Sequence, residues 1–316
     1  MSVVFTFPGQ GAQEPDMLDR LPAHTAVDAT LDEASRVLGE DVRGLDSAES
    51  LHSTRAVQLS LLVAGVACSR LLAAEGCRPD MTMGLSIGAY AAAVCAEVLN
   101  FDDAVRLVSL RGHLMETAFP RDYGMAAVIG LDQDRVEAIV HQVHAPEHPV
   151  YVANINAADQ IVVAGHDTGL AKVIDLAIQA HAKRAKRLAI SVPSHCALLN
   201  DAAAQMADAF KTIQIRRSTI GYLSANAARL ISDPLRIADD LAHNMARQVH
   251  WHDCARLAYE RGMRLAVEMP PGSVLTAITR GMMCSGGDSI AFANSRTDTV
   301  LELCRRARDD DFLPYR

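Results

Sequence analysis

A serine lies at the centre of the pentapeptide Gly84-Leu85-Ser86-Ile87-Gly88, which has the G-x-S-x-G spacing of a nucleophile turn. In such a turn a strand reverses sharply into a helix, so side chains two positions on either side of the serine would clash. The serine hydroxyl then stands at a helix N-terminus, where unpaired N–H groups and the helix dipole stabilise a developing oxyanion. The pattern predicts a nucleophile, but a pentapeptide also occurs by chance and needs support from its context.

A nucleophilic serine needs a base within hydrogen-bonding reach, and the chain contains twelve histidines. Most of them fall at predicted helix ends or loops, where solvated histidines are common. His195 differs because it follows Pro193 in the segment SVPSHC, at a predicted junction between two lobes that would overlook a cleft. From the residues alone, His195 is either the general base or a packed core histidine.

Arg111 is a third candidate for chemistry. It lies on the apolar face of a predicted helix over residues 102–119, next to Gly112, which would admit close approach of a ligand or of another backbone. Such an arginine either pairs with a structural carboxylate or binds an anionic substrate. Its planar guanidinium would bind a substrate carboxylate through two hydrogen bonds and so fix the orientation of the substrate.

The composition limits the class of protein. With 316 residues, 50% hydrophobic content and 22% charged residues, the chain can bury a large core and is long enough for two lobes. The net charge of −8 and the scattered basic residues argue against nucleic-acid binding. Its seven cysteines have no metal-site spacing and indicate reduced thiols, its N-terminus does not resemble a signal peptide, and its longest apolar run, residues 61–68, is too short to span a membrane. These features predict a soluble cytoplasmic protein without a bound metal.

The hydrophobic pattern predicts the elements that carry these residues. Strands are expected at residues 3–7 and 81–85, and helices at 56–74, 89–98 and 102–119, which indicates an α/β lobe with a parallel sheet. Later strands are expected at 220–223 and 264–268, and a helix from residue 202. The charged segment 304–316 is expected to be a solvated tail.

A second lobe is predicted between these parts. Residues 124–192 give strands at 125–129, 150–155, 160–164 and 187–192, with helices at 132–143 and 168–182. This βαββαβ order is the ferredoxin-like motif. We therefore expect a large α/β-hydrolase-like lobe of residues 1–123 and 193–316, with a small ferredoxin-like lobe of residues 124–192 inserted into it and a ligand cleft between the two.

Six segments then resemble one family when taken in order. They are FPGQGAQ at 7–13, GLSIGAY at 84–90, LRG at 110–112 followed by Met115, GMAAVIG at 124–130, ANINAADQIVVAG at 153–165 and SVPSHCALL at 191–199. Together they resemble the malonyl-CoA:acyl carrier protein transacylases, and the resemblance runs from about residue 3 to about residue 280.

The resemblance implies roles for the candidate residues. Ser86 would attack a thioester, His195 would be its general base, and Arg111 would hold the malonyl carboxylate. Gln10 would join the backbone N–H of Ile87 in the oxyanion hole. The reaction would be a ping-pong exchange through a malonyl-serine, with malonyl-CoA as a substrate and no permanently bound cofactor.

The same resemblance implies further substrate-binding residues. Arg184 would contact coenzyme A or the arm of the carrier protein, and Asn154 and Asn156 would line the cleft. Asn244 stands where the family usually has a glutamine that orients the histidine, and Met115 belongs to the segment around Arg111.

Some positions depart from the family pattern. The family usually has histidine and glutamate where this chain has Leu85 and Ala89, and Gly-Pro-Gly where it has Pro270-Pro271-Gly272. With these departures the chain looks more like the epsilon subunit of malonate decarboxylase, a malonyl transferase that charges a carrier with a phosphoribosyl-dephospho-CoA arm. Other subunits of that enzyme would then be partners.

The sequence therefore predicts a malonyltransferase that loads an acyl carrier protein, serving malonate decarboxylase. The alternatives are a transacylase of fatty-acid synthesis with a phosphopantetheine-type carrier, a serine hydrolase or thioesterase, and an inactive scaffold subunit. A hydrolase would need an acidic partner for its histidine and would have no use for Arg111. The intact set of Ser86, His195 and Arg111 argues against a scaffold.

Overall fold

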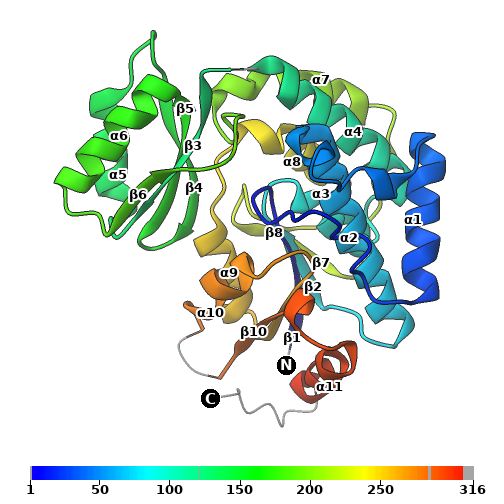
Figure 1. Ribbon diagram of the computed structural model, residues 1–316. Coiled ribbons are helices and arrows are strands. Elements are labelled where there is room, and N and C mark those ends of the chain that lie inside the picture. The colour runs from blue at the N-terminus through cyan, green and yellow to red at the C-terminus, as the bar shows by residue number, and fades with distance from the viewer. Residues whose placement is uncertain (1, 120, 284–285, 309–316) are drawn as a thin grey trace.

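The chain forms two β-sheets of different kinds with helices packed on both (Figure 1). The computed structural model describes residues 2–119, 121–283 and 286–308. The strands of the larger sheet are β1 (Ser2–Phe7), β2 (Met81–Gly84), β7 (Gly221–Ser224), β8 (Arg229–Ile231), β9 (Met263–Glu268) and β10 (Asp288–Ala291). Their spatial order is β10-β9-β1-β2-β7-β8, and every neighbouring pair is parallel except β7 with β8. This confirms the prediction of an α/β fold with a parallel sheet.

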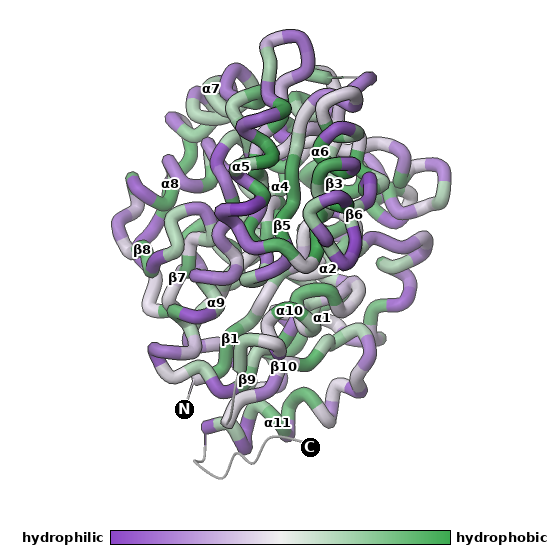
Figure 2. Tube along the Cα trace, turned by 90° about the vertical axis from the view of Figure 1, so that its left-hand side faces the viewer, coloured by the Kyte–Doolittle hydropathy of each residue, from purple (hydrophilic) through white to green (hydrophobic). Residues whose placement is uncertain are grey.

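Helices surround the larger sheet. They are α1 (Thr25–Leu38), α2 (Thr54–Ala74), α3 (Gly88–Cys95), α4 (Phe101–Ala118), α7 (Asn200–Phe210), α8 (Pro234–His243), α9 (Trp251–Glu260), α10 (Val274–Arg280) and α11 (Thr297–Arg308). Figure 2 shows hydrophobic residues concentrated along the inner elements of both sheets, with hydrophilic segments on the outer turns. The burial of apolar side chains between these layers is the main favourable contribution to folding.

Helix α2 is the central helix of the core. It is long and apolar enough to cross a membrane by length and composition, so the expectation that its apolar run is too short for this was wrong. In the fold, however, 89% of its most apolar stretch is buried. A helix that spans a bilayer instead exposes apolar side chains to lipid, so the composition of α2 is explained by the protein core.

The smaller sheet has the order of a ferredoxin-like unit. Its elements are β3 (Tyr123–Ile129), α5 (Gln133–Val143), β4 (Val150–Ala157), β5 (Gln160–His166), α6 (Asp167–Gln179) and β6 (Arg184–Arg187). The spatial order β4-β5-β3-β6 is antiparallel throughout, and α5 and α6 pack together on one face (Figure 1). These elements span residues 123–187 and so lie inside the predicted lobe except for Tyr123. The lobe boundaries at 123/124 and 192/193 remain a prediction.

One strand of this unit was predicted in the wrong place. The alternating apolar residues of 187–192 predicted a strand, whereas the strand that pairs with β3 is the charged segment Arg184–Arg187. A charged sequence suits β6 because it is the edge of its sheet, where charged side chains oppose pairing with another chain. Leu188 and Ile190 are apolar for another reason: they pack in a small hydrophobic cluster and line a cavity.

The expectation of a solvated tail from residue 304 was also partly wrong. Residues 304–308 form the last turns of α11, and Cys304 and Ala307 are buried against the larger sheet. Residues 309–316 lie outside the described residues. The charged side chains led to the expectation of a tail because α11 is amphipathic and turns its arginines outward.

Candidate active site

Ser86 lies in a tight turn between β2 and α3. Its backbone has φ of 54°, in the left-handed region that a non-glycine residue rarely adopts. A Cβ added at Gly84 would lie 2.1 Å from the carbonyl carbon of Gly88, and one at Gly88 would lie 2.1 Å from the carbonyl oxygen of Phe7. Both glycines are therefore required for the close crossing of the turn over β1, as the pentapeptide predicted.

The turn presents donors beside the serine. Among the described residues, the main-chain N–H groups of Ile87 and Gln10 have no acceptor. Ile87 is the N-cap residue of α3, and Gln10 lines the same cavity as Ser86. Both N–H groups can thus donate to an oxyanion that develops on an atom bound to the serine.

Arg111 lies directly beside the serine. It is fully buried on α4, and its Nη2 lies 3.3 Å from Oγ of Ser86. Its other contacts are amide oxygens: Nη1 donates to Gln58 Oε1 at 2.7 Å and Nη2 to Asn244 Oδ1 at 3.0 Å. Within the described residues its guanidinium contacts no carboxylate, and its Nε has no partner. Of the two interpretations left open by the sequence, pairing with a structural carboxylate is therefore not observed.

The surroundings of Arg111 are unfavourable for a charge without a counterion. Burial lowers the pKa of its guanidinium to about 10. The guanidinium carbon lies 5.9 Å from the centroid of the Tyr90 ring, close enough for a cation–π contribution. Gly112 admits the close approach of a backbone rather than a ligand, because a Cβ there would lie 2.4 Å from Cα of Arg55 on α2. The fold thus brings α4 against α2 and holds a cation beside the serine.

His195 lies on the same cavity as Ser86. It is buried, its backbone has φ of 62°, and its N–H donates to the carbonyl of Met245 at 2.6 Å. Its Nδ1 is within hydrogen-bonding distance of the carbonyl oxygens of Asn244 (2.9 Å) and Arg247 (3.1 Å). Because carbonyls only accept, Nδ1 carries the proton and Nε2 is the basic nitrogen. Burial, and then the charge of Arg111, lowers the pKa of His195 to about 4, so the imidazole is neutral at pH 7.

Asn244 contacts both candidate residues, but through different groups. Its main-chain carbonyl accepts from His195, while its side-chain Oδ1 accepts from Arg111. The expectation that the side chain at this position orients the histidine is therefore not what the structure shows. The backbone orients His195, and the residue type at 244 acts on the arginine.

Gln58 is a site residue that the sequence did not predict. This glutamine is fully buried on α2, and its Nε2 lies 3.2 Å from both Gln10 Oε1 and Met115 Sδ. With Oε1 bound to Arg111, Gln58 links the arginine to the loop of Gln10. The only signal in the sequence was a polar residue within an apolar helix, which has no motif of its own. Met115, a predicted substrate-binding residue, lies behind Gln58 and is fully buried.

A cavity of about 660 Å³ opens between the two sheets beside Ser86 and His195. Asn154 and Asn156 of β4 line it, and neither amide oxygen has a hydrogen-bond partner among the described residues. Its lining also includes apolar side chains of β3, β5 and α10, together with Lys186 and Arg187 of β6. Arg184 is not among the lining residues; it lies two positions before Lys186, on the same face of β6 and further along the strand.

The site as a whole combines four features. It has a serine in a strained turn, a neutral imidazole with Nε2 as its basic nitrogen, N–H groups beside the serine and a buried guanidinium; in the part of the chain that the structure describes, these N–H groups have no acceptor and the guanidinium has no carboxylate partner. The first three suit acyl transfer through a covalent acyl-serine. The fourth suits an acyl group that carries a negative charge.

Comparisons with known proteins agree with this chemistry. The profile of the family described as acyl transferase domain matches residues 4–313. Malonyl CoA-acyl carrier protein transacylase of Salmonella typhimurium is 36% identical over 282 residues, which cover 87% of this chain and 91% of that protein.

Solved structures give the same picture. The acyl-carrier-protein S-malonyltransferase of Burkholderia pseudomallei is 33% identical, with a TM-score of 0.90 over 96% of this chain and 100% of that one. A malonyl-transacylase solved in complex with a type II PKS acyl-carrier protein is 32% identical, with a TM-score of 0.89 over 98% of this chain and 100% of that one.

Proposed function

The chain belongs to the acyl transferase domain family, and from this premise we propose that it transfers a malonyl group from malonyl-CoA to the thiol of an acyl carrier protein. The observation that carries the proposal is the buried guanidinium of Arg111, 3.3 Å from Ser86 Oγ, whose hydrogen bonds within the described residues go to amide oxygens and to that hydroxyl. A malonyl thioester has a carboxylate one methylene away from its reactive carbonyl. Arg111 can bind this carboxylate while Ser86 attacks the carbonyl.

The first half-reaction forms a malonyl-serine. Nε2 of His195 accepts the proton of the Ser86 hydroxyl as Oγ bonds to the thioester carbon. The N–H groups of Ile87 and Gln10 donate to the oxyanion of the tetrahedral intermediate. When the intermediate collapses, the carbon–sulfur bond breaks and His195 gives its proton to the departing thiolate of coenzyme A.

The second half-reaction reverses these steps with another thiol. The carrier thiol gives its proton to His195 and attacks the malonyl ester, and the ester bond to Ser86 breaks as Oγ takes the proton back. Throughout both halves Arg111 holds the same carboxylate, so the acyl group keeps its position while the two thiols exchange. This arrangement requires no cofactor other than the substrate thioester.

The walls of the cavity support binding of the thioester arms. The side-chain amides of Asn154 and Asn156 line the cavity and can form hydrogen bonds with the amide groups of a pantetheine arm. Lys186 offers positive charge at the cavity, and Arg184 extends this charge along β6 toward coenzyme A or a carrier, whereas Arg187 is paired with Asp167.

The hydrolase alternative has less support. In a Ser-His-Asp triad a carboxylate accepts from the histidine, whereas here two main-chain carbonyls do so. A hydrolase of simple esters would also gain nothing from a buried arginine beside its nucleophile, because an unpaired buried charge costs stability.

The relatives support a transacylase, the alternative interpretation in the sequence analysis, better than a malonate decarboxylase subunit. We therefore propose a phosphopantetheine-type carrier and a cytoplasmic enzyme. A carrier with a phosphoribosyl-dephospho-CoA arm is the second candidate, because Leu85 lines the cavity and Ala89 is buried where the resembling family usually has histidine and glutamate.

Mass spectrometry tests the proposal. After mixing with malonyl-CoA, we expect a malonyl adduct on Ser86 that disappears when carrier protein is added, with malonyl then found on the carrier thiol. The Ser86→Ala variant should form no adduct. Rapid release of free malonate without carrier would indicate a hydrolase, and no adduct would indicate a scaffold. Parallel reactions with the two carrier types decide between them.

A further inference from the structure

A chain of side-chain amides leads from Arg111 away from the reacting atoms, and this inference rests on the proposed function of Arg111. Asn244 accepts from Arg111 with Oδ1, and its Nδ2 donates to Oδ1 of Asn226 at 2.8 Å. Asn226 follows β7 and is half-buried. It does not line the cavity beside Ser86, so it touches no reacting atom.

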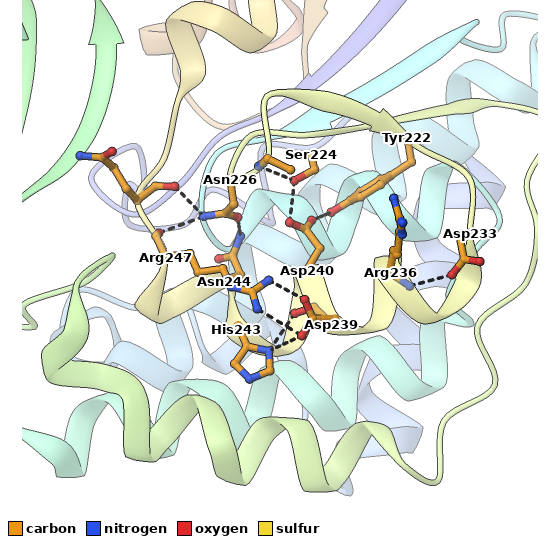
Figure 3. A network of polar contacts seen from close by, with 12 residues as sticks. Tyr222, Ser224, Asn226, Asp233, Arg236, Asp239, Asp240, His243, Asn244 and Arg247 are labelled. Atoms are coloured by element: carbon orange, nitrogen blue, oxygen red, sulfur yellow. Dashed lines mark hydrogen bonds and ion pairs between the residues drawn. The ribbon is translucent and has the colours of Figure 1, made fainter.

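Asn226 is held in one orientation by the main chain. Its Nδ2 donates to the carbonyl oxygens of Arg247 at 2.9 Å and of Gln248 at 3.1 Å. These two bonds use both hydrogens of the amide nitrogen. A rotated amide would place Oδ1 against two carbonyl oxygens, which also only accept, so Oδ1 must point toward Asn244 (Figure 3).

The orientation of Asn226 determines that of Asn244. Because Asn226 offers only an oxygen, Asn244 must turn its Nδ2 toward it, and this leaves Oδ1 facing Arg111. The reverse orientation of Asn244 would aim an N–H donor at the guanidinium, which has no acceptor. We propose that Asn226 is a positioning residue, which acts through Asn244 to hold Arg111 in the geometry that selects a malonyl group.

The segment that carries Asn226 is itself fixed. The hydroxyl of Ser224 accepts from the N–H of Ala227 at 3.0 Å and donates to the buried carboxylate of Asp240 at 2.5 Å. Tyr222 donates to the other oxygen of Asp240 at 2.9 Å (Figure 3). The turn after β7 is thus tied to α8, and Asn226 has a rigid base from which to act.

Asn226 has a second contact that must be separated from the first. The carbonyl of Arg247 that accepts from Asn226 also accepts from Nδ1 of His195. Loss of this support would slow acylation by any thioester. An effect transmitted through Asn244 to Arg111, in contrast, changes the preference for malonyl over acetyl, so the ratio of the two kcat/KM values isolates it.

The test is a double-mutant cycle on purified full-length protein, with malonyl-CoA and acetyl-CoA as acyl donors. In Asn226→Ala we expect the ratio of malonyl to acetyl kcat/KM to fall about tenfold, the size of one lost hydrogen bond to a charged group. In an Asn244→Ala background, the same substitution should leave the ratio unchanged, because the link to Arg111 is already absent. Asn100→Ala is the control, since Asn100 precedes α4 without a side-chain capping bond and should keep the wild-type ratio.

Two results would overturn the proposal: an equal loss for both donors in Asn226→Ala, or the same fall in ratio in both backgrounds. If Asn226→Ala does not fold, Asn226→Leu replaces it, because leucine is similar in size and has no oxygen to accept from Asn244; the same fall is expected. Failure of the wild-type protein to form malonyl-Ser86 would instead refute the proposed function. Protection of the wild-type protein by free malonate, measured as a rise in Tm, should also weaken in Asn226→Ala.

Discussion

Nη2 of Arg111 lies 3.3 Å from Oγ of Ser86, although the two residues are 25 positions apart, Arg111 on α4 and Ser86 in the turn between β2 and α3. The contact exists because α4 packs closely on α2 at Gly112, while the turn at Ser86 is forced toward the same point by its two glycines. A nucleophile and an anion receptor are thus held at the spacing of a short dicarboxylic acyl group.

Replacing Arg111 by Ala should impair malonyl loading far more than acetyl loading. The arginine would donate charge-assisted hydrogen bonds to the malonyl carboxylate, each contributing roughly 1.5 to 3 kcal/mol, and acetyl has no group to receive them. We expect kcat/KM for malonyl-CoA to fall on the order of 100-fold or more, and that for acetyl-CoA to change by less than about tenfold. Steady-state kinetics with both donors measure this.

Arg106→Ala is the matched control. Arg106 lies on the same helix but is exposed, and it pairs with Asp102 and Asp103. Its loss should leave both rates near the wild-type values, since exposed ion pairs contribute little. Equal losses for malonyl and acetyl in Arg111→Ala would remove the assigned role of Arg111.

The pH dependence of acylation should reflect the environment of His195. Burial, and then the charge of Arg111, lowers the pKa of this histidine to about 4, and only the neutral imidazole can accept the proton of Ser86. We expect kcat/KM for acetyl-CoA to stay level as pH falls from 7 to about 5, and to decrease as pH falls through the pKa. Rapid-quench acylation with circular dichroism at each pH separates this effect from acid unfolding.

The effect of the Arg111 charge on the pKa of His195 can be tested in the same way. Arg111 disfavours the imidazolium, so its removal should raise the pKa of His195 toward the ordinary value of 6.5. The decrease in acetyl kcat/KM of Arg111→Ala should therefore begin at a higher pH than in the wild type. If this decrease begins at the same pH as in the wild type, or at a lower pH, the charge of Arg111 does not lower the pKa of His195.

The regular elements of the fold could be predicted because each carries its own periodicity. The strand before Ser86, the long apolar helix α2 and the βαββαβ order of residues 124–192 all follow from local hydrophobic patterns. Strand β6 could not be found this way, because an edge strand with the sequence Arg-Ala-Lys-Arg has no apolar face. Its apolar neighbours Leu188 and Ile190 serve the cavity and produced a false strand.

Only part of the site could be predicted from the sequence. The serine turn is a local motif, so Ser86 could be derived from its glycines. Arg111 and His195 reach it only through tertiary structure, and the sequence proposed them together through family resemblance. Gln58 and Asn226 carry no pattern, because a single amide becomes informative only when its neighbours in space are known. The split role of Asn244 likewise depended on which of its oxygens faces which partner.

The Ser86 turn should not tolerate a methyl group at Gly88. An alanine Cβ there would lie 2.1 Å from the carbonyl oxygen of Phe7, so the crossing of the turn over β1 must open. We expect Gly88→Ala to lose about 3 kcal/mol of unfolding free energy and most of its acylation rate. Gly44→Ala is the control, because nothing lies within 4 Å of a Cβ at that position, and its unfolding free energy should change by less than about 0.5 kcal/mol. Urea denaturation measures both, and equal stabilities would contradict the role of the crossing.

A carboxylate introduced at Gln58 should compete with the substrate for Arg111. Gln58 Oε1 already accepts from Nη1 at 2.7 Å, so Gln58→Glu keeps this bond and adds the negative charge that the guanidinium lacks. We expect malonyl acylation to fall about 100-fold and acetyl acylation by less than about tenfold, since only the first needs a free cation. The rise in Tm caused by free malonate in the wild type should also disappear. Gln205→Glu, on the exposed face of α7, should leave all three measurements unchanged. If Gln58→Glu kept its malonyl preference, the buried arginine would not be the receptor of the carboxylate.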